Sequence, residues 1–150
     1  MKIIIQNKKA LFDYDINFKI EAGIVLGGDE VKSLRAKRGS LNGSFATVKN
    51  GELFLINCNI PVYSHAYSKD EDAATRSRKL LLHRKELNKL IGEISQKGMT
   101  VIPLKVYFNN KNLAKVELGV GRHRKATGKK QLLKERDIKR ETQRELKKHR

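Results

Sequence analysis

The spacing of apolar residues is the feature of this sequence that most limits its fold. Over residues 12–20 every second residue is apolar, and the residues between them are polar. This period of two is typical of a half-buried β-strand. Further strands are predicted over 44–48, 53–56, 102–108 and 114–120. Five or six short antiparallel strands result, and closing them into a small barrel would leave no strand edge exposed.

Two other signals refine this pattern. Asn50-Gly51 lies between two predicted strands, which indicates a tight hairpin because both turn residues accept positive φ. Leucines and isoleucines between 80 and 94 share one face at a period of 3.6, which predicts one long helix. Asp72 or Thr75 could cap its start, and Lys97-Gly98 suits its end.

Leu81 and Leu82 lie off the apolar stripe of this helix. Either neighbouring elements cover them or they are left to contact a partner. Strands with one long helix predict a mainly β fold of the OB type, although an SH3-like barrel with an added helix would give much the same pattern.

Charge divides the chain. Lys and Arg number 33 against 16 Asp and Glu, a net charge of +17, and about half of that excess lies in residues 122–150. We therefore predict a domain over 1–121 and a basic tail over 122–150, with too few apolar residues to build its own core. So large an excess indicates a polyanionic partner, and nucleic acid before an anionic membrane.

The usual signatures of enzymes, metal sites and membrane segments are missing. No phosphate-binding glycine loop, zinc motif or paired catalytic residues can be found, so we predict no catalytic residue, no metal and no cofactor. No apolar run approaches the roughly 20 residues of a spanning helix. Cys58 is the single cysteine, which fits a reducing cytoplasm and is most simply explained as a small buried residue.

Three segments are specific enough to indicate a family. They are EAGIVLGGDEVKSLR at 21–35, RSRKLLLHRKEL at 76–87, and KGMTVIPLKVYF at 97–108 followed by AKVELG at 114–119. Together they closely resemble the bacterial SsrA-binding protein family, also called small protein B. The resemblance runs without a large gap from about Asn7 to Lys130.

This resemblance implies an OB-type closed barrel with flanking α-helices and a basic C-terminal tail. It implies a monomeric cytoplasmic RNA-binding protein that is not an enzyme. Its partners would be transfer-messenger RNA and the ribosome. The protein would bind the tRNA-like part of that RNA, support its aminoacylation and deliver it to stalled ribosomes for trans-translation.

The family's RNA contacts fall on three matching positions, Asn7, Glu21 and Leu81. An amide can bind a base edge, a carboxylate can accept from exocyclic amines, and a leucine can lie against a base or sugar. Glu21 could also simply pair with a nearby lysine, and Leu81 could belong to the core. Neutralisation of phosphates, which fixes position without reading sequence, is predicted for Lys8, Lys32, Arg76, Arg78, Lys79, Arg122 and Arg124.

The tail departs from the family pattern. In the alignment without a gap, Lys125 keeps a family lysine, while Thr127 and Gly128 replace an aromatic residue or His and an Asp. A second alignment, with an insertion, would match Gly128-Lys129-Lys130 literally. The family's tail enters the vacant mRNA channel as a helix, so we predict that this tail is disordered when free and helical there. The predicted ribosome contacts are Lys125, Thr127, Lys129, Lys130, Lys134 and Arg136.

Other functions remain open from the sequence. One is a ribosomal or general RNA-binding protein of OB type with a basic extension. Another is an RNA-modifying enzyme, for which no catalytic group can be named. A barrel that binds single strands would need more stacking aromatics than the nine Phe and Tyr residues here.

Overall fold

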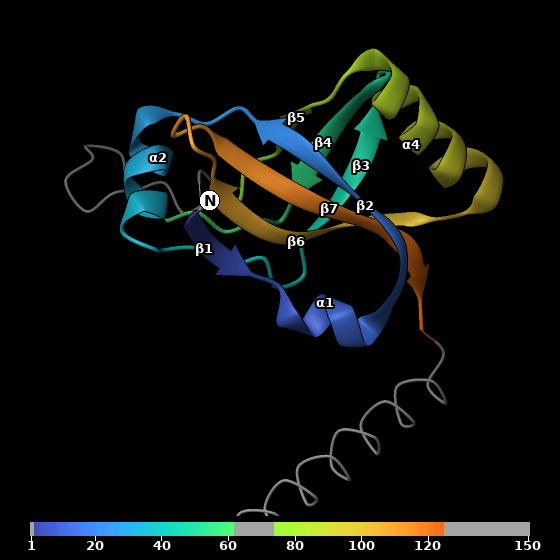
Figure 1. Ribbon diagram of the computed structural model, residues 1–150, viewed down its shortest axis with the longest axis horizontal. Coiled ribbons are helices and arrows are strands. Elements are labelled where there is room, and N and C mark those ends of the chain that lie inside the picture. The colour runs from blue at the N-terminus through green and yellow to red at the C-terminus, as the bar shows by residue number, and fades with distance from the viewer. Residues whose placement is uncertain (1, 62–73, 125–150) are drawn as a thin grey trace, which may run out of the picture.

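The computed structural model describes residues 2–61 and 74–124 (Figure 1). Its seven strands are β1 (Lys2–Gln6), β2 (Tyr14–Ile24), β3 (Phe45–Lys49), β4 (Glu52–Ile56), β5 (Arg78–Leu81), β6 (Thr100–Phe108) and β7 (Ala114–His123). Its helices are α1 (Lys8–Asp13), α2 (Gly28–Arg35) and α4 (Arg84–Lys97). The predictions that Lys125, Thr127, Lys129, Lys130, Lys134 and Arg136 contact the ribosome lie outside the described residues.

All the strands belong to one antiparallel sheet. Its order is β1-β6-β3-β4-β5-β2-β7, and β6 also pairs with β7, so the pairings of six strands form a ring. The β2–β7 and β6–β7 pairings are the longest in this ring. The β3–β6 pairing is the shortest, because one residue pair, Ala46 and Val101, joins these strands. The mainly β antiparallel architecture predicted from the alternation is therefore confirmed.

The core lies on the inner side of this sheet. Every second side chain of β2 and β7 points inward, so that Ala22, Ile24, Val116 and Leu118 are buried together. Leu90 of α4 joins the same cluster. A second, small cluster of Ala10, Ile102 and Leu104 lies where α1 covers the other side of β6.

The predicted turns are present. Asn50 and Gly51 both have positive φ, 54° and 73°, and they join β3 to β4. Gly98 ends α4 in the left-handed conformation at φ 64°, as the Lys97-Gly98 pair predicted. Cys58 is fully buried, also as predicted.

Two element predictions were wrong. Phe12 belongs to α1 and not to the strand, which starts at Tyr14. Leu80 and Leu81 lie in β5, so the long helix starts only at Arg84, after His83 at its N-cap and not after Thr75. Asp72, the other cap considered, lies outside the described residues. At the other end, β7 continues two residues past the predicted domain boundary at Gly121, and the division into domain and tail stays a prediction.

Candidate nucleic-acid interface

Strand register places two of the predicted RNA contacts, Glu21 and Leu81, on one side of the sheet. One row of paired residues crosses four strands as Gln6, Lys105, Glu117 and Glu21. The next row crosses five strands as Ile3, Tyr107, Lys115, Gly23 and Leu81. Corresponding members of the two rows on β6, β7 and β2 are two residues apart, so they lie on the same side of each strand.

We call this surface the outer face and define it by Glu21, Leu81, Lys105, Tyr107, Lys115 and Glu117. Its members alternate with inward residues such as Ala22, Leu80 and Val116, which are nearly or fully buried. Figure 1 shows β2 and β7, which carry three of these residues, running side by side across the front of the molecule. The structure therefore brings Glu21 and Leu81 together, although they are 60 positions apart in sequence.

Glu21 is exposed and is held by a tyrosine. The Tyr107 hydroxyl donates a hydrogen bond to Oε2 of Glu21, and Tyr107 itself is 5% exposed. Burial raises the pKa of Tyr107 well above its ordinary value, and the hydrogen bond and negative charge of Glu21 raise it further. Tyr107 thus stays a neutral donor. No other hydrogen bond to the Glu21 carboxylate is found within 2–61 and 74–124.

Lysines surround the second carboxylate of the outer face. Glu117 lies directly across from Glu21 in the β2–β7 register. Its oxygens form ion pairs with Lys19 Nζ at 3.7 Å and with Lys105 Nζ at 3.3 Å. Like charges opposite each other in a sheet repel, so these ion pairs reduce a repulsion that would otherwise act on Glu21. Glu21 is left without a lysine partner among the described residues.

Leu81 projects from β5 with half of its surface exposed. Gly23 lies beside it, and a Cβ added to Gly23 would be 3.3 Å from the Leu81 Cβ. The glycine therefore leaves room for the leucine to lie across β2. The sequence left open whether neighbouring elements cover Leu81 or leave it free to contact a partner. In the structure Leu81 lies in β5, outside the core, and is left exposed.

Asn7 and Lys8 reach the edge of the same surface. A hollow of about 300 Å³ is lined by Lys8 and Asn7 together with Gln6, Leu11, Lys19, Leu104, Lys105 and Glu117. Lys8 is exposed, but Asn7 is only 6% exposed and caps α1. Its Oδ1 accepts from the Ala10 N–H at 3.2 Å, and its Nδ2 donates to the Pro103 carbonyl at 3.0 Å. The structure supports a role for Asn7 in positioning α1 and Lys8.

Arg78 departs from the phosphate contact expected of it. Its side chain is fully buried. Nε donates to Glu30 Oε2 at 2.5 Å, and the guanidinium also donates to the carbonyls of Cys58 at 2.6 Å, Ala74 at 2.9 Å and Arg76 at 3.1 Å. A buried guanidinium with four protein acceptors cannot also reach a phosphate. The physical reason for the difference is the alternation of β5, which turns Arg78 inward beside Leu80.

Glu30 is the centre of this network. Burial raises its pKa, but hydrogen bonds from the Gly27 N–H, Arg76 and Arg78 outweigh that effect and hold the pKa below its ordinary value. The carboxylate thus caps α2 and joins it to the chain before and within β5. Burial also raises the pKa of the Cys58 thiol to about 11, which leaves it uncharged.

The other predicted cations lie around the sheet. Lys32 is exposed on α2, and Arg76 is exposed while paired with Glu30. Lys79 lies on the same side of β5 as Leu81 and pairs with Glu52 at 3.0 Å. Arg122 donates to the Lys97 carbonyl at 3.0 Å, and the Arg124 N–H donates to the Asp13 carbonyl at 2.7 Å. Arg122 lies near the end of β7, about 17 Å along the strand from Glu117, and Arg124 follows directly after the strand.

The sequence did not reveal the residues that hold Glu21 and Glu117. These residues, Tyr107, Lys105 and Lys19, belong to the outward positions of predicted strands, so alternation alone could have placed them outside. Nothing in the sequence shows which outward positions become neighbours across strands. Within the described residues, no set of His, Cys, Asp and Glu is grouped to hold a metal ion, and no helix is long and apolar enough to cross a membrane.

Comparison with known proteins identifies the family. The family model described as SmpB protein matches residues 4–148. The chain belongs to the SmpB family. The SsrA-binding protein of Halalkalibacterium halodurans is 49% identical over 146 residues, which cover 97% of this chain and 94% of that protein. The SsrA-binding protein of Thermosipho africanus is 45% identical over 150 residues and covers all of both chains.

A solved structure gives the same result. The chain is similar to one in a structure described as "tmRNA-SmpB: a journey to the center of the bacterial ribosome", with a TM-score of 0.66 and 49% sequence identity. The match covers 81% of this chain and 84% of that chain. The resemblance drawn from three sequence segments is therefore confirmed over nearly the whole chain.

Proposed function

We propose that this protein is an RNA-binding adaptor that binds the tRNA-like domain of transfer-messenger RNA. It then delivers that RNA to stalled ribosomes for trans-translation. The observation that carries the proposal is the outer face, where Glu21 and Leu81 lie on the same side of two paired strands in a chain whose relatives are named SsrA-binding proteins. The action is binding and delivery, without catalysis, in the cytoplasm where ribosomes work.

The proposal includes the finer fold. The ring of pairings among β6, β3, β4, β5, β2 and β7 supports an OB-type closed barrel with flanking helices and a basic tail. Such barrels commonly bind nucleic acid on one face. Between β3 and β6 the ring is closed by one register pair, Ala46–Val101, which is fewer than at any other junction of the ring.

The chemistry of the outer face suits bases that have left a helical stack. The Glu21 oxygen that Tyr107 does not occupy can accept from the exocyclic amine of a base. Leu81 offers exposed apolar surface to a base or sugar face, and an unstacked loop of a tRNA-like fold presents such groups. Lys8, Lys105 and Lys115 would neutralise nearby phosphates and fix the position of the RNA without reading its sequence.

The remaining expectations keep their place in the proposal. Lys32, Arg76, Lys79, Arg122 and Arg124 are proposed as phosphate contacts around the outer face. Asn7 acts on RNA binding by holding α1 and Lys8 in place. The tail of residues 125–150 contacts the decoding centre and the mRNA channel, and the protein binds RNA as a monomer.

A competition titration tests the proposal. The full chain is bound to the tRNA-like domain of transfer-messenger RNA, with bulk tRNA as competitor, across a salt series. Binding through phosphates alone weakens steeply with salt and yields equally to either RNA. We expect a preference for the tRNA-like domain that survives rising salt. Equal competition at every salt would instead favour a ribosomal or general RNA-binding protein of OB type.

Two variants assign the preference to the outer face. Glu21→Gln removes the strongest acceptor, and Leu81→Ser removes exposed apolar surface. Each should reduce the preference for the tRNA-like domain, by roughly 1–3 kcal/mol if it makes a base contact. Glu86→Gln is the matched control, since it removes the same charge from α4, which carries no residue of the outer face. Equal effects of Glu21→Gln and Glu86→Gln would remove Glu21 from the interface.

A further inference from the structure

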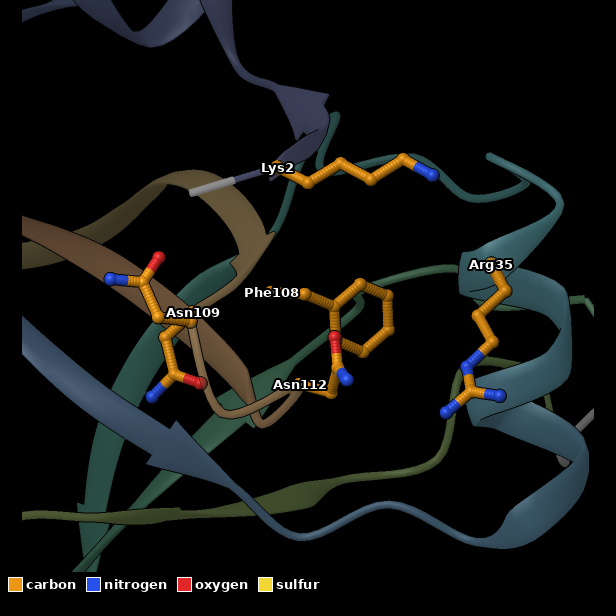
Figure 2. A pocket seen from close by; sticks show the side chains of 6 residues that line it. Lys2, Arg35, Phe108, Asn109 and Asn112 are labelled. Atoms are coloured by element: carbon orange, nitrogen blue, oxygen red, sulfur yellow. The ribbon is translucent and has the colours of Figure 1, made fainter.

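A second hollow lies beyond the outer face, beside α2. Its volume is about 540 Å³, and its lining residues are Lys2, Arg35, Phe108, Asn109, Asn110 and Asn112. Figure 2 shows Lys2 and Arg35 reaching over it from β1 and α2, with the Phe108 ring between them. The volume lies within the roughly 300–1,000 Å³ of pockets that take small ligands.

The hollow is positively charged and lacks a carboxylate. No Asp or Glu lines it, and among residues 2–61 and 74–124 neither Lys2 nor Arg35 makes an ion pair. Lys37 and Arg38 follow the C-cap residue Ala36 of α2 and are exposed. Elsewhere in the described chain, Glu30, Glu52, Glu93 and Glu117 each neutralise a lysine or arginine. Unpaired cations over a concave surface attract an anion.

The asparagines supply groups of a different kind. Asn109 builds the β6–β7 turn, because its Oδ1 accepts from the Lys111 and Leu113 N–H groups at 2.9 and 3.0 Å. Asn112 is held at φ 59° by that turn and is exposed. Its side-chain amide makes no hydrogen bond within the described residues. A free amide offers both a donor and an acceptor, which the edge of a nucleobase requires.

We propose that this hollow takes one nucleotide of the bound RNA. Lys2 and Arg35 hold its phosphate, Asn112 binds the edge of its base, and the Phe108 ring forms the apolar floor. The proposal rests on the proposed function for its RNA partner and adds a second contact to the outer face. Phe108 follows Tyr107 of the outer face directly along β6, but its side chain belongs to the core side of that strand, so one RNA molecule would reach both surfaces around the β6–β7 turn that ends the sheet.

Three variants test the site in the full chain. Lys2→Gln/Arg35→Gln removes both cations. Asn112→Gly removes the amide without strain, because glycine accepts a φ of 59° readily. Arg84→Gln/Lys85→Gln is the matched control, since it removes the same charge from exposed positions on α4. Circular dichroism melting of each variant verifies that its fold is unchanged.

The probe is the tRNA-like domain of transfer-messenger RNA, titrated across a salt series with inorganic phosphate as a separate competitor. The salt slope is the slope of the logarithm of the binding constant against the logarithm of the salt concentration. We expect Lys2→Gln/Arg35→Gln to lower the size of this slope by about one to two, and Arg84→Gln/Lys85→Gln to leave it nearly unchanged. Asn112→Gly should weaken binding about fivefold, which corresponds to the loss of one net hydrogen bond. Its salt slope should equal that of the parent chain, because no charge is removed.

Several results would overturn the proposal. Equal loss of slope in the two double variants would assign Lys2 and Arg35 to the general basic field. Unchanged affinity of Asn112→Gly would leave no contact to the base. Displacement of the RNA contact by millimolar inorganic phosphate would identify a free-anion site. In each case the preference of the parent chain for the tRNA-like domain would persist, which separates this failure from failure of the proposed function.

Discussion

The buried Arg78 gives the sharpest test of the structure, because a surface phosphate contact and a buried anchor predict opposite results. Arg78→Ala would leave the Glu30 carboxylate without its closest buried partner and the carbonyls of Cys58 and Ala74 without a donor. The methyl group left behind cannot fill the space of a guanidinium. We therefore expect this variant to lose stability and not only RNA affinity.

The size of the loss follows from the burial. Removing one partner of a buried ion pair costs about 3–5 kcal/mol; Glu30 keeps Arg76 here, but the carbonyls of Cys58, Ala74 and Arg76 also lose their buried donor. Domains are stable by roughly 5–15 kcal/mol, so this loss is a large share of the whole. At about 4 °C per kcal/mol for a domain of this size, the melting temperature should fall by roughly 12–20 °C. Arg78→Lys should recover only part of this, since an ammonium cannot reproduce the planar fork.

Arg76→Ala is the matched control. Arg76 donates to the same carboxylate, but 41% of its side chain is exposed, so the pair should contribute at most about 1 kcal/mol. The measurement is thermal and urea unfolding of both variants, followed by circular dichroism. Equal melting temperatures for Arg78→Ala and Arg76→Ala would refute the buried network. A stable Arg78→Ala with a reduced salt slope of RNA binding would restore the phosphate contact expected from the sequence.

Three other predictions concern stability. Because the pKa of Glu30 is lowered in the folded protein, its carboxylate stabilises the fold above the ordinary pKa of 4.5, and this stabilisation is lost as the pH falls through the folded pKa. Glu30→Gln should therefore make the midpoint of urea unfolding depend less on pH between pH 3 and 6. Asn7→Ala should cost about 2 kcal/mol in urea unfolding, since it removes an N-cap and a buried donor, and a change below about 0.5 kcal/mol would contradict this. Gly121→Ala should unfold the end of β7, because its Cβ would lie 2.0 Å from the Asp15 carbonyl oxygen; hydrogen exchange of β7 amides would detect the opening, and native protection would contradict the prediction.

The strands were predictable because one side of each is buried. Alternation placed β6 and β7 within a few residues of their observed bounds, and Asn50-Gly51 fixed the hairpin between β3 and β4. The start of the helix was not predictable from the same rule. Leu80, Leu81 and Leu82 are consecutive, and a run of three leucines fits a period of two as well as a period of 3.6. Only pairing of β5 with β2 and β4 decides in favour of a strand.

The site was predictable only in part, since a row across strands depends on register. The β1–β6, β2–β7 and β6–β7 pairings each contain an irregularity, such as the shift between Pro103 and Lys105. Each shift changes which residues are neighbours, and nothing in the sequence marks its position. Glu21 and Leu81 were therefore predicted from the resemblance alone, and no prediction named Tyr107. Arg78 was predicted at the surface because its segment was not recognised as a strand. In a strand, Arg78 lies on the same side as the buried Leu80.

Under the proposed function, the outer face would explain how a chain with a net charge of +17 selects one RNA among many. Lysines and arginines attract every RNA, so they add affinity without preference. A preference for one RNA needs groups that lose free energy when a different RNA covers them. Glu21 repels any phosphate that approaches it, and Tyr107, with its raised pKa, keeps the carboxylate in place without neutralising it. An RNA that brings a base amine to Glu21 gains a hydrogen bond there, whereas one that brings a phosphate is excluded, and this difference stays when salt weakens the surrounding lysines.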